Sequence, residues 1–308
     1  IDEKEVQLDA PVKTVNGSSL IPLSFIVKAF PVKIEVDTEN SIININNFNC
    51  GLTLTAKSHI LVEPKSGLIL VDHNSHEKLK AGSVNTVMNL LLIFEALENK
   101  LISSDSMVTA SQQAADTGGS QIFLTAGEKQ SVETLTGSMA MIGANDAAVA
   151  MAEYIAGSED AFVDLMNKKA EILGLKDTHF VNATGLDAEE QFTSVYDIAI
   201  VTRELMTKYP EVLEFSSAKN MIIKKNGPSG EVSFSLSNSN KLIDSYHGAS
   251  GLKTGYTAEA GYCIAGFAER SGFQLIAVVL GASDSTVRYD ETTALLDCGF
   301  ESYEVLGI

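Results

Sequence analysis

The sequence has few basic residues, and this shortage excludes several kinds of partner. Its 308 residues carry 22 Lys and Arg against 40 Asp and Glu, which gives a formal net charge of −18. A surface with this balance repels polyanions, so nucleic acid and anionic membrane surfaces are excluded as expected partners. The excess of acidic residues is typical of a well-solvated protein surface.

Cysteine and histidine are also scarce. The three cysteines, Cys50, Cys263 and Cys298, are too few for a disulfide framework, although one bridge is possible. Among the five histidines only His73 and His76 are close in sequence, and no cysteine or second carboxylate pair surrounds them. We therefore expect no metal site and no cofactor, and we interpret these two histidines as surface residues on a turn.

Long apolar runs are missing as well. No run reaches the roughly 18 residues that a membrane-spanning helix needs, so we expect no transmembrane segment. The first residues, Ile1-Asp2-Glu3-Lys4, are polar and do not form a secretion signal. If such a signal existed, we expect that it was removed.

Residues 1–50 predict a small α+β unit. The stretch "APVKTVNGSSLIPLSFIVKAF" has a turn at Asn16-Gly17 and a short helix from Pro22 to Phe30, and "VKIEVDTENSIININ" alternates like a β-hairpin. In this order the elements resemble the small N-terminal domain of copper amine oxidases and of many Gram-positive surface proteins. The stretch contains no histidine, so we infer no copper, and we expect a role as a spacer or in wall attachment.

Residues 51–308 predict a second, larger domain. "HILVEPKSGLILVDH" indicates a hairpin, and the region from Ser83 to about Leu213 is mostly helical, with helix starts expected at Ser131, Asn145, Glu159 and Ser194. Apolar strands follow ("MIIKK", "EVSFSL", "GYCIAGFAE", "FQLIAVVLG"), and a last helix covers "STVRYDETTALLDCGF". Strands at both ends with helices between them predict an α+β fold with one antiparallel sheet.

Three short motifs suggest serine acyl transfer, which uses S-x-x-K, S-x-N and K-T-G. A serine at a helix start gains from the helix dipole, and a lysine one turn later takes its proton. The third motif is intact as Lys253-Thr254-Gly255. The first two have changed, to Ser83-Val84-Asn85-Thr86 and Gly143-Ala144-Asn145.

About 240 residues, from His59 to Phe300, resemble the low-molecular-mass penicillin-binding proteins, the serine D-alanyl-D-alanine carboxypeptidases. The stretches that carry the resemblance are "SVNTVMNLLLIFEALENKLI", "GANDAAVAMAEYIAGSEDAFVDLMNKKAEILGLKDTHFVNATGLD" and "NSNKLIDSYHGASGLKTGYTAEAGYCIAGFAERSGFQLIAVVLG". It implies a five-stranded antiparallel sheet between helices, trimming of the terminal D-alanine from peptidoglycan stem peptides, acylation by penicillins, and an extracytoplasmic location. Cell-wall synthesis proteins are further expected partners.

By this resemblance Ser83 is the nucleophile, Asn145 and Lys253 complete the catalytic set, and Thr254, Gly255 and Tyr256 bind substrate. The backbone N–H groups of Ser83 and Tyr256 are the expected oxyanion donors. Asn89, inside the apolar helix, is expected to be a satisfied core amide.

Thr86 and Gly143 stand where the family has its lysine and its second serine. Threonine has no useful basicity at neutral pH and glycine has no side chain, so Ser83 lacks its usual base. Lys253 is the best replacement, since Lys80 lies too far back on the entering loop. A second S-x-x-K match, "SHEK" at residues 75–78, follows the hairpin directly and is not followed by an apolar helix, which favours Ser83.

Three functions remain open. The chain is a catalytically impaired carboxypeptidase homologue that still recognises stem peptides or a wall-synthesis partner; a working carboxypeptidase that uses Lys253 as base; or a non-catalytic cell-wall scaffold. We expect the first, because triad-like groups act as a unit and two of them have changed. We also expect Ser83, Asn145 and Lys253 to meet in one cleft.

Overall fold

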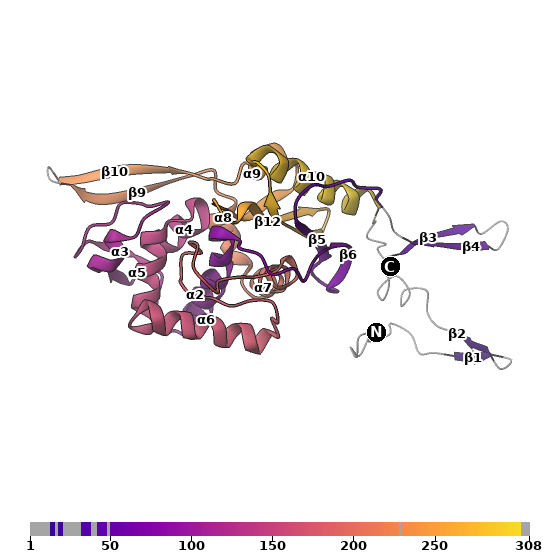
Figure 1. The fold of residues 1–308 in the computed structure, drawn as a ribbon, viewed down its shortest axis with the longest axis horizontal. Helices are drawn as coiled ribbons and strands as arrows, with labels where there is room; N and C mark the ends of the chain where they lie inside the picture. Colours follow the sequence, from indigo (N-terminus) through magenta and orange to yellow (C-terminus); the bar gives the residue numbers. More distant parts are fainter. Residues whose placement is uncertain are drawn as a thin grey trace.

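The computed structural model describes residues 13–15, 18–20, 32–37, 42–47, 50–227 and 230–302 (Figure 1). Near the N-terminus, strands β1 (Lys13–Val15) and β2 (Ser18–Leu20) pair antiparallel, as do β3 (Val32–Asp37) and β4 (Ile42–Asn47). The second pair confirms the hairpin predicted from the alternating stretch. The expected turn at Asn16-Gly17 and the helix from Pro22 to Phe30 lie outside the described residues.

The main sheet has five antiparallel strands in the order β11-β12-β13-β5-β6. The strands are β5 (Ser58–Glu63), β6 (Leu68–His73), β11 (Ala249–Thr257), β12 (Gly261–Arg270) and β13 (Phe273–Ala282). The sheet therefore joins the hairpin after residue 57 to the strands that follow residue 248. This confirms the predicted α+β fold class with a five-stranded antiparallel sheet.

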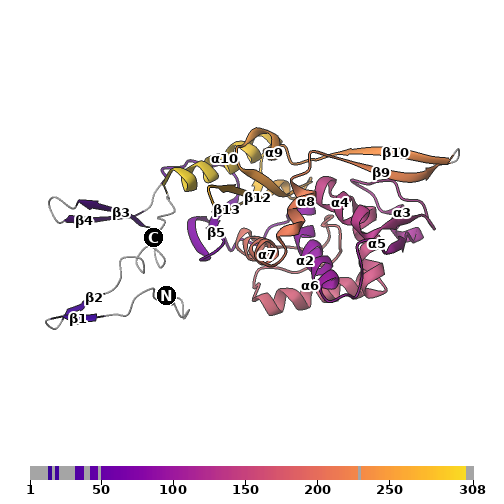
Figure 2. The ribbon, with the colours of Figure 1, turned by 180° about the vertical axis from the view of Figure 1, so that it is seen from behind.

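Helices cover both faces of this sheet (Figures 1 and 2). Successive residues of a strand point to opposite faces. Ile276 and Val278 of β13 belong to the core shared with the helical region, whereas Ala277 and Val279 belong to the core beneath the last helix, α10 (Ser285–Ser302). All four residues are fully buried. The strand is apolar and buried from Leu275 to Leu280 because both of its faces are covered there.

The helical region lies between β6 and β11 in the chain. Its longer helices are α2 (Thr86–Glu98), α4 (Val132–Ile142), α5 (Asn145–Ala156), α6 (Glu159–Leu173) and α7 (Val195–Lys208). Its short elements are η1 (Gly82–Asn85), β7 (Met107–Thr109), α3 (Gln112–Asp116), β8 (Lys129–Ser131), η2 (Pro210–Val212), α8 (Leu213–Ser216) and α9 (Leu242–Ser245).

Three of the longer helices begin at a serine cap. The side chains of Ser131, Ser158 and Ser194 each accept a hydrogen bond from the backbone N–H three residues later. Such a cap satisfies one of the free donors of the first turn and stabilises a helix by about 1 kcal/mol. The four helix starts expected from the sequence are confirmed to within one residue.

Two strands differ from the prediction of one sheet. β9 (Asn220–Gly227) and β10 (Gly230–Ser237) pair with each other in a hairpin that projects past α4 and α3 (Figure 1). Ile223 and Leu236 face the body of the protein and are buried, whereas Ile222 is 71% exposed. The two strands pair only with each other in the described structure, and Ile223 and Leu236 pack in one apolar cluster with residues of α4 and α5 rather than in the main sheet.

A disulfide joins Cys50 to Cys298, which lie 248 residues apart in the chain. Cys298 is on α10, and Cys50 precedes β5. The sequence left open whether any cysteines pair, and the structure supplies this one bridge. The thiol of Cys263 is free and buried, and burial raises its pKa to about 11.

Candidate active site

Ser83 lies in the short helical turn η1, which leads directly into α2. Nine of the thirteen residues of α2 are buried, so the helix is a fixed support rather than a surface element. This confirms the prediction that the Ser83 region begins a buried helix. The hydroxyl of Ser83 forms no hydrogen bond within the described part of the chain.

Thr86 turns back to its own helix. Its hydroxyl donates a hydrogen bond to the backbone carbonyl of Ser83 at 2.8 Å, and its side chain is buried. A lone pair that could accept the Ser83 proton would still belong to an alcohol, which is not a base at neutral pH. Thr86 therefore closes the first turn of its own helix, and its side chain offers no base to Ser83.

Gly143 marks the point where the three motifs meet. It caps the C-terminus of α4 with a φ of +68° and a ψ of +42°, a conformation that glycine adopts without strain. A Cβ built on it would lie 3.0 Å from Lys253 Nζ, 3.3 Å from Ser83 Cβ and 3.4 Å from Ser83 Oγ. A side chain at this position would thus contact both Lys253 and Ser83, and glycine has none.

Asn145 begins α5 and is held by the loop that precedes β8. Its Nδ2 donates to the Gly118 carbonyl at 2.8 Å, and its backbone N–H donates to the Ser120 carbonyl at 2.7 Å. Its Oδ1 is buried and has no hydrogen-bond partner in the described structure. The amide is therefore fixed by its nitrogen while its oxygen is left unsatisfied.

The carboxylate of Asp146 fixes that loop. It accepts hydrogen bonds from the backbone N–H groups of Ile122 and Leu124 at 2.9 to 3.1 Å, and it is completely buried. Because a carboxylate bound to several backbone donors holds them firmly, the loop that carries Gly118 and Ser120 has a defined position beside Asn145.

Lys253 is a buried amine on β11. Its side chain is 1% exposed, and its Nζ donates to the Thr254 carbonyl at 3.1 Å. Burial, assisted by the charge of Arg288, lowers the pKa of Lys253 to about 7. At neutral pH a large fraction of this lysine is therefore the free amine, which is the form that can accept a proton.

The strand β11 lies directly against the turn that carries Ser83. A Cβ on Gly255 would lie 2.5 Å from the Ala81 carbonyl oxygen and 2.9 Å from the Ser83 nitrogen, so only glycine permits this approach. Thr254 contacts Ser239 through their hydroxyls at 3.0 Å. Tyr256, by contrast, is 57% exposed, and its ring packs on that of Tyr262.

The structure thus brings Ser83, Gly143, Lys253 and Gly255 together, with Asn145 two residues beyond Gly143. Lys253 Nζ and Ser83 Oγ would lie 3.0 and 3.4 Å from a Cβ on Gly143. Thr86 is in the same turn as Ser83 but points to the backbone.

Two residues at this site were not predicted. Arg288 of α10 donates to the carbonyls of Gly255 and Cys263 at 3.2 and 3.3 Å, and thereby holds β11 and β12 behind Lys253. Gly185 also packs closely on the turn, where a Cβ would lie 3.2 Å from Ser83 Cα. A single sequence gives no signal for Arg288, which looks like any charged residue of the last helix.

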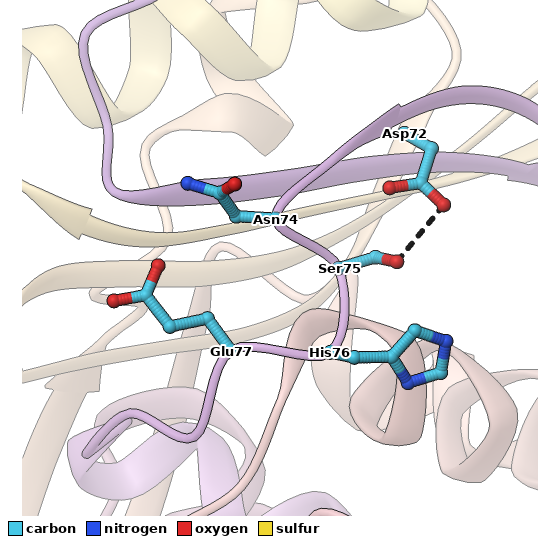
Figure 3. A pocket seen from close by; sticks show the side chains of 5 residues that line it. All are labelled: Asp72, Asn74, Ser75, His76 and Glu77. Carbon is cyan, nitrogen blue, oxygen red and sulfur yellow. Dashed lines mark hydrogen bonds between the residues drawn. The ribbon is translucent and has the colours of Figure 1, made fainter.

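The alternative serine, Ser75, lies elsewhere. It donates to Asp72 at 2.9 Å on the turn after β6 and begins no helix (Figure 3). Lys78 lies over the ring of Phe192, 4.7 Å from its centroid, and is thus engaged in a cation–π contact. The turn lines an open hollow of about 430 Å³ with the residues Asp72, Asn74, Ser75, His76 and Glu77. The "SHEK" serine therefore lacks the buried helix that follows Ser83.

Among the described residues, no group of three or more His, Cys, Asp or Glu side chains is arranged to hold a metal ion. In the same part of the chain, none of the helices combines the length and apolar character required to cross a bilayer.

Comparison with known proteins agrees with this geometry. The D-alanyl-D-alanine carboxypeptidase family model matches residues 45–284. The D-alanyl-D-alanine carboxypeptidase DacF of Bacillus subtilis is 44% identical over 249 residues, which cover 81% of this chain and 63% of that protein.

Two solved structures show the same fold. That of the D-alanyl-D-alanine carboxypeptidase DacD from Francisella tularensis has a TM-score of 0.78 at 29% identity, and the match covers 82% of this chain and 72% of that one. Penicillin-binding protein D2 from Listeria monocytogenes, solved with ampicillin bound, has a TM-score of 0.71 at 30% identity over 81% of this chain and 98% of that one. The chain spans slightly less than two thirds of the length of the Bacillus relative. With most of its length matched by the family model, by a close relative and by solved folds, this chain belongs to the D-alanyl-D-alanine carboxypeptidase family.

Proposed function

We propose that this chain recognises D-alanyl-D-alanine stem peptides and β-lactams in the cleft at Ser83, and that its acylation is strongly impaired. The observation that carries the proposal is the missing side chain at Gly143, where a Cβ would lie 3.0 Å from Lys253 Nζ and 3.4 Å from Ser83 Oγ. A serine there would pass a proton between the two groups. Because Thr86 also turns away from the Ser83 hydroxyl, neither proton-handling group of the family pattern is present.

Recognition of the substrate depends on parts that remain. β11 is an edge strand of the five-stranded sheet, and it carries Thr254, Gly255 and Tyr256 close to Ser83. An extended peptide can add to such an edge through backbone hydrogen bonds. The Listeria relative was solved with ampicillin bound, which supports a β-lactam as a ligand of this cleft as well.

Acylation requires that Ser83 Oγ bonds to the substrate carbonyl carbon while its proton moves to the leaving nitrogen. We expect the backbone N–H groups of Ser83 and Tyr256 to stabilise the oxyanion, a role that needs no side chain. Loss of a general base costs about 10²–10⁴-fold in rate. The residual rate therefore comes from the oxyanion donors and from binding alone.

A second candidate function is a working carboxypeptidase with Lys253 as base. One observation favours it: Lys253 is buried beside the site, and its pKa is lowered to about 7. A free amine there has the basicity to accept the serine proton. However, no described hydrogen bond joins Lys253 to Ser83, and the amine instead donates to the Thr254 carbonyl.

The test restores the two missing groups. Thr86→Lys with Gly143→Ser should raise the rate of acylation by a fluorescent penicillin by at least 10²-fold over the parent chain. Thr86→Met with Gly143→Ser is the matched control, because methionine is an unbranched side chain close to lysine in size but has no base, and this variant should remain slow. Intact-protein mass and peptide mapping should place the adduct on Ser83.

The other outcomes distinguish the three functions. Rapid labelling of the parent chain, lost in Lys253→Met, would replace the proposal by the second candidate. No labelling of the restored, folded variant would mean that the cleft no longer binds the substrate, and the scaffold function would then stand.

We also propose that residues 1–50 form a separate unit that serves as a spacer or in wall attachment, and that the chain acts outside the cytoplasm. The chemistry of the substrate supports the second point, since peptidoglycan stem peptides are extracytoplasmic. Stoichiometric copper or zinc bound by the chain and lost on deletion of residues 1–50 would contradict the expected metal-free spacer.

A further inference from the structure

The β9–β10 hairpin contacts the loop that holds Asn145, and it does so through Lys225. The Lys225 amine donates a hydrogen bond to the Ile122 carbonyl at 2.6 Å and a second one to the Phe123 carbonyl. It also lies 3.5 Å from a carboxylate oxygen of Glu128, and the two side chains are 15% and 4% exposed. A lysine of the projecting hairpin is therefore buried against the backbone of a residue 103 positions earlier in the chain.

Phe123 requires such support because its backbone is strained. Its φ of +59° lies in the left-handed region, which a bulky L-residue rarely adopts. A residue of this kind persists only where the surrounding contacts hold it in place. Asp146 binds the backbone N–H groups of Ile122 and Leu124, one on each side of Phe123. Lys225 binds the carbonyls, so both the N–H groups and the carbonyls of the strained segment are engaged.

The same loop orients the amide of Asn145. The carbonyls of Gly118 and Ser120 accept hydrogen bonds from the side chain and the backbone nitrogen of Asn145. A Cβ on Gly119 would lie 2.5 Å from Asn145 Nδ2, so the backbone of the loop lies directly against this amide. Residues 117–125 form no helix or strand. Contacts with neighbouring elements, rather than a backbone ladder of their own, therefore determine where these carbonyls lie.

We propose that Lys225 is a positioning residue for the site: by fixing the strained segment at Phe123, it keeps the loop, and with it the Asn145 amide, in the orientation that binds substrate. The β9–β10 hairpin, which lies outside the main sheet, thereby gains a role in recognition. The inference rests on the proposed function, because Asn145 acts here as a group that binds the stem peptide or the β-lactam.

Lys225→Met is the informative change, because methionine is an unbranched side chain close to lysine in size but has no N–H donors. Without these donors the Phe123 backbone relaxes to a negative φ, and the Gly118 carbonyl no longer has a fixed position beside Asn145. The amide then binds the ligand less well before and during the reaction alike. An interaction made equally in the ground state and the transition state changes affinity and leaves the rate at saturation unchanged.

The experiment measures binding of a fluorescent penicillin to the full chain by anisotropy, and acylation in the restored Thr86→Lys, Gly143→Ser variant. Lys225→Met should raise the dissociation constant about tenfold, because it removes charged hydrogen bonds, and should change the acylation rate at saturating penicillin by less than about twofold. Lys225→Arg keeps the charge and the donors and should restore most of the affinity. Lys224→Met is the matched control. Lys224 points to the other face of β9, is 67% exposed and pairs with Glu231, so its loss changes the net charge equally but should leave the affinity unchanged.

The orientation of the amide is measured separately, by the NMR signals of the Asn145 side-chain NH₂ group in the chain without ligand. In Lys225→Met these signals should shift and their protons should exchange faster with solvent, whereas Lys224→Met should leave both as in the parent. If Lys225→Met does not fold, Phe234→Ala tests the same support, since the Phe234 ring packs edge-on against that of Phe123 with 6.4 Å between centroids. It should give the same changes with a loss of affinity of about threefold.

A purely structural role for Lys225 would lower the free energy of unfolding without changing the affinity. Unchanged affinity in a folded Lys225→Met chain, unchanged Asn145 signals, or an equal loss of affinity in Lys224→Met would each overturn the inference and leave the proposed function standing. If neither the parent nor the restored variant binds penicillin, the proposed function fails. The Asn145 signals then still decide whether Lys225 positions the amide.

Discussion

Replacing Lys253 with methionine should change how stability depends on pH. The pKa of Lys253 is lowered to about 7 in the folded protein from an ordinary value of 10.5, chiefly by burial. Between these values the unfolded chain binds more protons than the folded one, so the free energy of unfolding rises with pH. The penalty is fully present below pH 7 and disappears as the pH approaches 10.5.

The size of this effect follows from the shift. Each pKa unit corresponds to about 1.4 kcal/mol, so the full penalty on the folded state is about 5 kcal/mol. Methionine fills a similar volume without the charge and loses only the hydrogen bond to the Thr254 carbonyl, worth about 1 kcal/mol. At pH 7 we therefore expect Lys253→Met to be more stable than the parent chain by a few kcal/mol.

The assay is urea unfolding of both proteins at pH 7, 8 and 9. The difference in the free energy of unfolding should shrink by about 1.4 kcal/mol for each pH unit. Lys80→Met is the matched control. Lys80 pairs with Glu259, which raises its pKa, so Lys80 stays charged from pH 7 to pH 9. Its removal should change the free energy of unfolding by the same amount at each pH and leave the pH dependence as in the parent chain. Parallel pH profiles for the parent and Lys253→Met would refute the assignment of a neutral buried amine.

Three further predictions concern the frame around the site. In the restored Thr86→Lys, Gly143→Ser variant, a further Gly255→Ala change should abolish penicillin labelling, because the new Cβ would collide with the backbone at Ala81 and Ser83. Gly118→Ala is the control and should have no such effect, since a Cβ there meets nothing within 4 Å. Asp146→Asn should lower the free energy of unfolding by about 2 kcal/mol, since a neutral amide accepts the Ile122 and Leu124 hydrogen bonds less strongly than a carboxylate. Hydrogen exchange at these two backbone amides should become faster, and unchanged exchange at both would contradict the prediction. Reduction of the Cys50–Cys298 bridge should lower the free energy of unfolding by about 4 kcal/mol, as measured in urea with and without reductant, and the Cys50→Ser, Cys298→Ser variant should not respond to reductant.

Local patterns predicted the elements of the fold well. Serines at positions 131 and 194 mark helix starts because a capping side chain acts within three residues, and the alternation around residues 32–47 marks a hairpin for the same local reason. The membership of β9 and β10 in the main sheet was wrong. Both strands have the expected composition, and which sheet a strand joins depends on distant pairing that composition does not encode.

At the site, too, local sequence patterns were informative, whereas properties that depend on distant residues were not. Short motifs, together with the family resemblance of the stretches around them, pointed to Ser83, Thr86, Gly143, Asn145 and Lys253. The lowered pKa of Lys253 could not be predicted from the sequence, because it arises from burial and from the charge of Arg288, which is 35 residues away in the chain. Asn89 was expected to be fully satisfied, but its oxygen is not, because the partner of a buried amide is set by packing between elements.

The disulfide between Cys50 and Cys298 also determines which covalent bonds transmit a mechanical force that is applied to the chain. A pull applied to the segments on either side of residues 50–298 would pass through two side chains and one sulfur–sulfur bond rather than through the sheet or the helices. The residues between Cys50 and Cys298 form a covalently closed loop, and the pulling force does not pass through them. The geometry at Ser83 would therefore remain unchanged under a pull at the two flanking segments, for as long as the bond stays oxidised.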